Sequence, residues 1–133
     1  MTKQISRNRW SEFEKMEVDL TSEDYISYLF RHYEDDTRDL AVNYLINNRE
    51  EVLESLIKNI LVRHSDPKSA PKNTENLNLE SRIQDFGVDS LGMMEIIVFF
   101  EQTFGTVIEI DRMQSIQTLE DIIKLIKEIQ SNK

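Results

Sequence analysis

The chain has 133 residues, of which 39% are hydrophobic and 31% are charged, and 16 lysines and arginines against 25 aspartates and glutamates give a net charge of −9. This length predicts one domain, and the apolar content excludes a wholly disordered chain. The acidic balance excludes a nucleic-acid-binding face and repels anionic membranes, but favours a basic partner protein. The absence of cysteine excludes disulfides, thiolate chemistry and cysteine-based zinc sites.

Glycine and proline are scarce, with three and two residues respectively, and this favours an all-α fold over a turn-rich β fold. No stretch reaches the 18 or so apolar residues that a membrane-spanning helix needs. The N-terminus has no continuous apolar region of the kind found in secretory signals. We therefore expect a cytoplasmic protein without a membrane span.

The first 48 residues predict a partly helical extension. Residues 1–18 are mixed in character and are expected to be loosely ordered. Residues 21–24 read Thr-Ser-Glu-Asp, a typical helix start, and apolar side chains at helical spacing follow over residues 25–33. After the acidic segment 34–36, residues 40–45 form a second short amphipathic stretch. This stretch could also continue into the next helix as one long rod.

The next segment predicts an amphipathic helix. Asn48 followed by Glu51 is a variant of the capping box and predicts the helix start. The helix is expected to end near residues 62–64. Its apolar stripe consists of Val52, Leu53, Leu56, Ile57, Ile60 and Leu61. Residues 65–78 hold both prolines and predict a loop, long enough to carry function or mobility.

Two further long helices follow this loop. One is expected from Ser90 to Phe104, ended by Gly105. Residues 106–117 form a connector with room for one helical turn. The last helix is expected to start at Thr118, with acidic residues in its first turn. Residues 49–133 therefore predict three main helices and a short fourth.

The helix at 90–104 is more apolar than one buried face requires. A bundle core would be satisfied by Leu91, Met94, Ile96, Phe100 and Phe104. Ile97, Val98 and Phe99 are then surplus, and a helix that is apolar on most sides is expected to be covered on most sides. We predict that the N-terminal helices supply this cover.

Asp89 and Ser90 at the start of that helix have two interpretations. Both residue types are favoured at helix starts, where their oxygens accept hydrogen bonds from free N–H groups. A phosphate-linked group on Ser90 would also be favoured there, because a helix N-terminus stabilises anions. Gly87 would allow the tight turn that exposes the pair.

Residues 85–91, Asp-Phe-Gly-Val-Asp-Ser-Leu, resemble the attachment-site motif of acyl carrier proteins. The resemblance covers about residues 49–130 and includes Glu95, Phe104 and the entry to the last helix at residues 116–121. It implies a four-helix bundle of the acyl carrier protein type, three main helices and one short, at residues 49–133. The helical extension at residues 1–48 is unusual for the family.

The resemblance also implies the function. Ser90 would carry 4′-phosphopantetheine, added by a phosphopantetheinyl transferase, with Asp89 beside it in the attachment motif. The thiol of the arm would hold acyl intermediates of fatty acid, polyketide or related biosynthesis as thioesters, so no residue is assigned a catalytic or metal-binding role. An acyl-loading ligase or transferase and downstream synthases would be the partners of a monomer.

Partner docking is where the chain departs from the family pattern. Many members have an acidic residue two positions after the serine, where this chain has Gly92, and more acids at the end of the helix, where it has Gln102 and Thr103. The docking residues expected here are Leu91, Met93, Met94, Glu95 and Glu101. Methionine suits such a surface because it adapts to varied apolar partners.

Two alternatives stay open. Residues 89–92 and 109–112 also resemble D-alanyl carrier proteins, which would make the cargo an aminoacyl group. The same pattern could instead belong to an unmodified helical interaction module.

Overall fold

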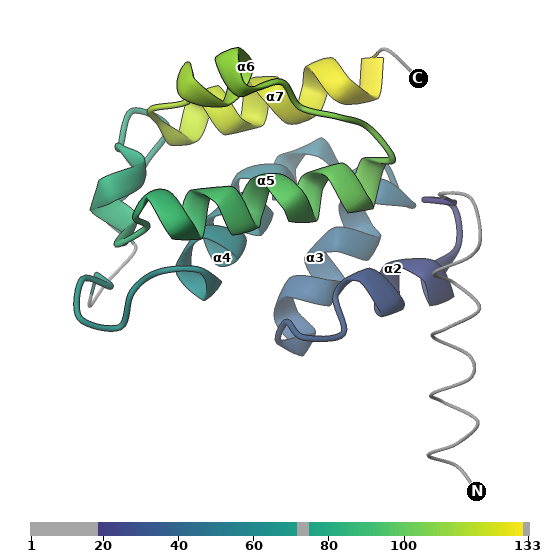
Figure 1. Cartoon of the computed structure of the whole chain (residues 1–133). Helices are drawn as coiled ribbons and strands as arrows, with labels where there is room; N and C mark the ends of the chain where they lie inside the picture. Colours follow the sequence, from purple (N-terminus) through teal and green to yellow (C-terminus); the bar gives the residue numbers. More distant parts are fainter. Residues whose placement is uncertain (1–18, 72–74, 132–133) are drawn as a thin grey trace, which may run out of the picture.

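The computed structural model describes residues 19–71 and 75–131 (Figure 1). The regular secondary structure of this part of the chain is helical, apart from an isolated backbone bridge between Arg82 and Thr118, and loops connect the helices. The elements are α2 (Glu23–Leu29), α3 (Asp35–Leu45), the 3₁₀ helix η1 (Glu50–Val52), α4 (Leu53–Arg63), the 3₁₀ helix η2 (Ile83–Phe86), α5 (Ser90–Phe104), α6 (Ile110–Gln114) and α7 (Leu119–Ser131). The predicted all-α fold is confirmed.

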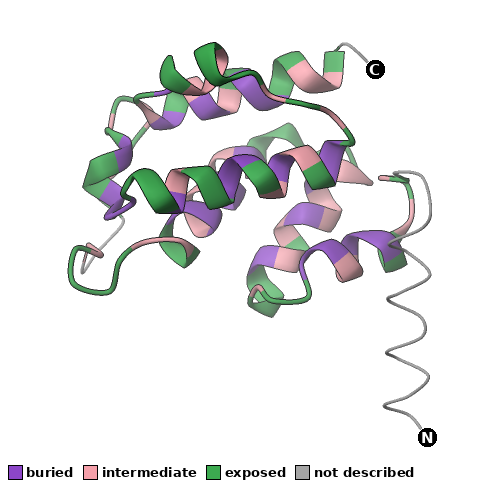
Figure 2. Cartoon of the chain, in the orientation of Figure 1, coloured by how far each residue is buried: buried purple, intermediate pink, exposed green. Residues whose placement is uncertain are grey.

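The C-terminal part is a bundle of three long helices and the short α6. In Figure 1, α5 lies in front of α4, with α6 and α7 above it. Figure 2 shows that the buried faces of these helices point toward one another. The centre of the core consists of Leu56, Ile60, Ile96, Phe100, Leu119, Ile122 and Ile126, all at most 4% exposed. Their burial from water is the main stabilising term for the bundle.

Local signals set several helix ends as predicted. α5 runs from Ser90 to Phe104 and ends at Gly105, which takes the left-handed conformation with φ 62°. At the start of α7, the Thr118 hydroxyl accepts from the Asp121 N–H at 3.3 Å, and the Asp121 carboxylate accepts from the Thr118 N–H at 3.0 Å. Burial alone would raise the pKa of Asp121, but the hydrogen bonds from Gln117 and Thr118 hold it below its ordinary value.

The prediction for the start of α4 is wrong. Asn48 is not its N-cap but has φ 56°, a left-handed conformation that asparagine tolerates. The Arg49 N–H donates to the carbonyl of Asn43 at 3.0 Å, so the chain reverses between α3 and α4. η1 then forms the first turn before α4 begins at Leu53. The alternative of one long rod is excluded by the same reversal.

The extension packs on the bundle through its aromatic side chains. α2 begins at the predicted cap, where the Ser22 hydroxyl accepts from the Tyr25 N–H at 3.2 Å. α3 packs on α2 and on α4. The Phe30 ring stands edge-on to Phe99 of α5 at 5.2 Å, with Tyr33 at 5.1 Å from the same ring. The predicted loose order of residues 1–18 lies outside the described residues.

The faces of α5 differ in part from the prediction. Leu91 and Met94, predicted as core, are 67% and 55% exposed, so that assignment is wrong. Ile97, predicted as surplus, is a buried core residue. The expected cover exists for Phe99, while Val98 remains 48% exposed. Leu91, Met94 and Val98 follow one another at helical spacing and therefore form one exposed stripe.

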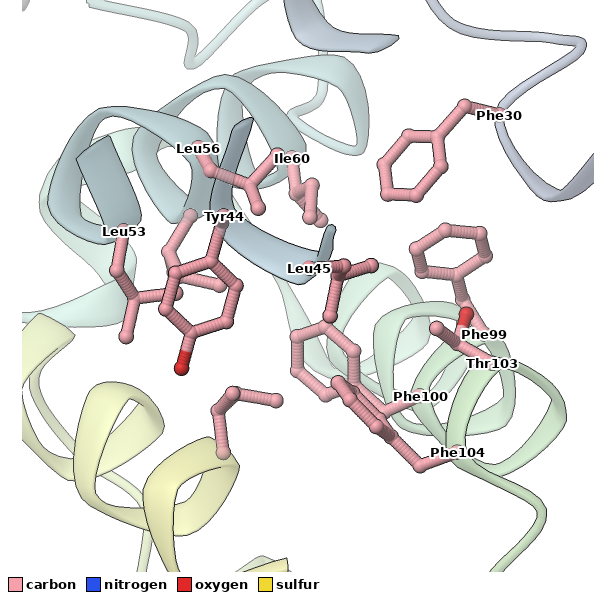
Figure 3. Close-up of a pocket in the computed structure, with 12 residues that line it drawn as sticks. Phe30, Tyr44, Leu45, Leu53, Leu56, Ile60, Phe99, Phe100, Thr103 and Phe104 are labelled. Carbon is pink, nitrogen blue, oxygen red and sulfur yellow. The ribbon is translucent and has the colours of Figure 1, made fainter. Parts of the chain in front are cut away.

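A small cavity of about 20 Å³ lies where the extension meets the bundle (Figure 3). Its lining comes from Phe30 at the C-cap of α2 and from α3, α4, α5 and α7, and consists mainly of apolar and aromatic side chains. Among the described residues, the buried hydroxyl of Thr103 lacks a hydrogen-bond partner, and Thr103 is only 2% exposed. Such a hydroxyl has lost its bonds to water without replacement.

Replacing Thr103 by valine is expected to raise the free energy of unfolding by about 1 kcal/mol, because the shape is kept and an unpaired hydroxyl is removed. Urea denaturation measures the change. Thr118→Val is the matched control and should lower stability by about 1 kcal/mol, since it removes a helix cap. Equal losses in both variants would show that the Thr103 hydroxyl is satisfied.

Within the described ranges, none of the helices is both long and apolar enough to cross a bilayer.

Candidate attachment site at the start of α5

Ser90 is the first residue of α5 and is exposed to solvent. Asp89 is the N-cap: its backbone is extended, with φ −93° and ψ −173°, and its Oδ1 accepts from the Gly92 N–H at 2.8 Å. This bond holds the first turn of a 15-residue helix whose positive end lies beside Ser90. An anionic ester on the serine oxygen is electrostatically favoured at this position.

Gly87 makes the turn that presents the Asp89-Ser90 pair. It has φ 78°, and its carbonyl accepts from the Asp66 N–H at 2.9 Å. A Cβ on Gly87 would lie 2.6 Å from the carbonyl oxygen of Ser69, because the loop after α4 passes directly against it. The turn therefore requires glycine for its conformation and for its space. Asp85 serves this turn too, since its carboxylate accepts from the Arg82 N–H at 2.8 Å.

The packing of α5 on α4 explains why residue 92 is a glycine. A Cβ at this position would lie 2.7 Å from the backbone oxygen of His64, which is the C-cap of α4. An acidic side chain two positions after the serine would therefore collide with the end of α4. The departure from the family pattern follows from how closely these two helix ends approach.

A groove of about 400 Å³ runs beside Ser90. Its lining is Arg82, Ile83, Gln84, Val88, Asp89, Ser90, Met93, Ile116 and Gln117. Two side-chain amides and a guanidinium group thus stand next to apolar side chains. This mixture fits a phosphopantetheine arm, which combines a phosphate and two amides with methyl and methylene groups. The described residues contain no group of three or more His, Asp or Glu placed to hold a metal ion.

The five predicted docking residues do not lie in equivalent surroundings. Leu91 and Met94 are exposed on the face next to Ser90, and Met93 is half-buried and lines the groove. Glu95 is exposed, with its Oε1 3.3 Å from Nδ1 of His64. Glu101 accepts a hydrogen bond from the Ile108 N–H at 2.8 Å, so its carboxylate holds the connector to α6.

Neither the exposure of Val98 nor the contact between His64 and Glu95 was predicted from the sequence. Leu91, Met94 and Val98 have helical spacing in the sequence. Because most residues between them are also apolar, the sequence does not show that these three form the exposed face. The contact between His64 and Glu95 joins residues 31 positions apart and has no local signal.

A family model matches the part of the chain that contains this site. The family model "Phosphopantetheine attachment site" matches residues 70–126. "Acyl carrier protein 3, chloroplastic" of Cuphea lanceolata is 38% identical over 63 residues, which are 47% of this chain and 43% of that protein. "Probable acyl carrier protein" of Caulobacter vibrioides (strain NA1000 / CB15N) is 43% identical over 53 residues, which are 39% of this chain and 62% of that protein. No solved structure matches.

The matches to these relatives therefore span between about two fifths and three fifths of the relatives' lengths. The family model fits the helical architecture, and the segment it matches includes the start of α5. Domains of this kind hold 4′-phosphopantetheine covalently and act as carriers, not as enzymes. These matches support a phosphopantetheine-binding carrier domain of the acyl carrier protein family over residues 70–126.

Proposed function

We propose that this protein carries acyl intermediates as thioesters on a 4′-phosphopantetheine arm attached to Ser90. The observation that supports this most directly is the exposed Ser90 at the N-terminus of α5, inside the segment that the attachment-site model matches. The arm supplies the thiol that this chain lacks, since the sequence contains no cysteine. If Ser90 served only to start the helix, its exposure beside a groove would have no functional explanation.

The chain's own residues contribute presentation and electrostatics. In the transferase reaction, the Ser90 oxygen forms a bond to the phosphorus that carries pantetheine in coenzyme A. The pyrophosphate bond of coenzyme A breaks, the nucleotide bisphosphate leaves, and the serine proton passes to a base of the transferase. Asp89 keeps the first turn of α5 closed during this step, and the helix dipole stabilises the resulting phosphodiester anion.

Incubation with a phosphopantetheinyl transferase and coenzyme A tests the proposal through the intact mass of the protein. The wild-type chain is expected to gain the mass of one arm, and Ser90→Ala is expected to gain none. Ser55→Ala, which changes an exposed serine of α4, is the matched control and should be modified like wild type. An unmodified wild type, or an arm on Ser90→Ala, would contradict the proposal.

The partner surface is proposed to be the exposed stripe of α5 together with Glu95, which lies beside it. Leu91 and Met94 offer apolar contact, and Glu95 offers negative charge to a basic partner such as the transferase, a loading enzyme or a synthase. The net charge of −9 supports electrostatic attraction of basic partners. The cargo is proposed to be a fatty acyl or polyketide group, and mass analysis of the species on Ser90 from native cells identifies it.

We also propose that the chain divides at residue 48 into an extension and a carrier domain at 49–133. The reversal at Asn48 separates α3 from η1 and α4, and α4 packs on α7 within the bundle. We expect the protein to be monomeric and cytoplasmic. Size-exclusion chromatography with light scattering measures the first property, and imaging in the source cell measures the second.

A further inference from the structure

Three side chains from three parts of the fold form a hydrogen-bonded row that ends near Ser90. The Tyr33 hydroxyl, in the extension, lies 2.8 Å from Nε2 of His64 at the end of α4. Nδ1 of His64 lies 3.3 Å from Oε1 of Glu95, in the second turn of α5. The row therefore connects the extension to the helix that carries the proposed attachment site.

The chemistry of the groups gives this row a direction. A carboxylate only accepts hydrogen bonds, so the tautomer of His64 that bonds Glu95 carries its hydrogen on Nδ1. Nε2 is then an acceptor and receives the hydrogen of the Tyr33 hydroxyl. Burial raises the pKa of Tyr33 far above its ordinary value, so this hydroxyl keeps its hydrogen. One tautomer of His64 thus satisfies both neighbours.

Packing holds Tyr33 and the end of α4 that carries His64. The Tyr33 ring lies against Phe30 at 5.2 Å and Phe99 at 5.1 Å, which leaves it little freedom to turn. The backbone carbonyl of His64 faces Gly92 so closely that no side chain fits there. Nε of Arg63 donates to the His32 carbonyl at 3.1 Å and ties α4 to the extension a second time.

We propose that Tyr33 is a positioning residue for the attachment site: through His64 it holds Glu95, and with it the first two turns of α5, in the orientation that partners meet. The inference rests on the proposed modification of Ser90. Glu95 lies five positions after Ser90 and is exposed together with Leu91 and Met94. Its orientation therefore bears on how a basic transferase docks beside the serine.

Tyr33→Phe removes the hydroxyl and keeps the ring, and Tyr44→Phe is its matched control. Tyr44 is also an extension tyrosine whose hydroxyl donates to the bundle, but its acceptor is Gln130 of α7. Tyr33→Phe is expected to raise the KM of the transferase for the protein by about two- to tenfold, the worth of one hydrogen bond, with kcat unchanged. Tyr44→Phe is expected to leave both parameters at wild-type values.

A double-mutant cycle separates positioning from general destabilisation. If Tyr33 acts through Glu95, the KM effects of Tyr33→Phe and Glu95→Ala should not multiply, because the second change removes the group that the first one misplaces. The effects of Tyr44→Phe and Glu95→Ala should multiply. Multiplicative effects in both cycles, or equal KM changes for the two tyrosine variants, would overturn the proposal.

Amide hydrogen exchange on the unmodified protein tests the coupling without any transferase. Tyr33→Phe should speed exchange in a peptide covering residues 90–98, whereas Tyr44→Phe should leave that peptide unchanged. Unchanged exchange in this peptide for Tyr33→Phe would overturn the coupling. A wild-type chain that accepts no arm would instead contradict the proposed function, while the exchange data would still decide the role of Tyr33.

Discussion

Phe30→Ala is expected to lower the free energy of unfolding by about 3–5 kcal/mol, the usual cost of removing a buried phenylalanine ring. Phe30 is only 3% exposed and meets Phe99 edge-on at 5.2 Å. It also lines the small cavity between the extension and the bundle, so the lost ring would enlarge an existing void instead of being replaced by neighbours. Urea denaturation of the full chain measures the loss.

Val98→Ala is the control for this prediction. Val98 lies on the same helix as Phe99 but is 48% exposed, and its truncation is expected to cost less than about 0.5 kcal/mol, as for most surface changes. A cost below about 1 kcal/mol for Phe30→Ala would contradict a tightly packed extension, because a buried large side chain cannot be removed so cheaply. Self-association of Phe30→Ala is a second expected result, since it would loosen the cover over Phe99.

Gly87→Ala is expected to have the other large effect, on stability and on the presentation of Ser90. Its Cβ would lie 2.6 Å from the carbonyl oxygen of Ser69 and 2.9 Å from Cα of Ala70, and both contacts are with backbone. Overpacking of this kind costs about 1–3 kcal/mol, and the left-handed conformation adds about 1–2 kcal/mol. We therefore expect a loss of about 2–5 kcal/mol and slower addition of the arm to Ser90.

Gly105→Ala isolates the backbone part of this effect. Gly105 is also left-handed, with φ 62°, but it is an exposed residue at the far end of α5. Its substitution should cost only the conformational strain of about 1–2 kcal/mol and should leave arm addition unchanged. Equal losses for the two glycines would show that the loop at Ser69 moves away from Gly87 without cost. Denaturation curves and transferase rates on both variants make the comparison.

Much of the fold follows from signals that are local in the sequence. α5 begins at Ser90 and ends at Gly105 as predicted, because a cap and a left-handed glycine act within one helical turn. The same is true of Thr118 and Asp121 at the start of α7. The start of α4 was mispredicted for the opposite reason. Asparagine is a residue type favoured at helix N-caps, but the chain reversal at Asn48 depends on how α3 and α4 pack.

The sequence by itself determined the helical class, the limits of α5, the start of α7, and the exposed serine beside a glycine turn, because these depend on periodicity and on neighbours within a few residues. Only the tertiary structure decided which side of α5 is buried. A helix that is apolar nearly all round has no preferred face, and Leu91 became exposed while Ile97 became core according to which helices lie against α5. The row from Tyr33 through His64 to Glu95 likewise depends on three segments meeting in space.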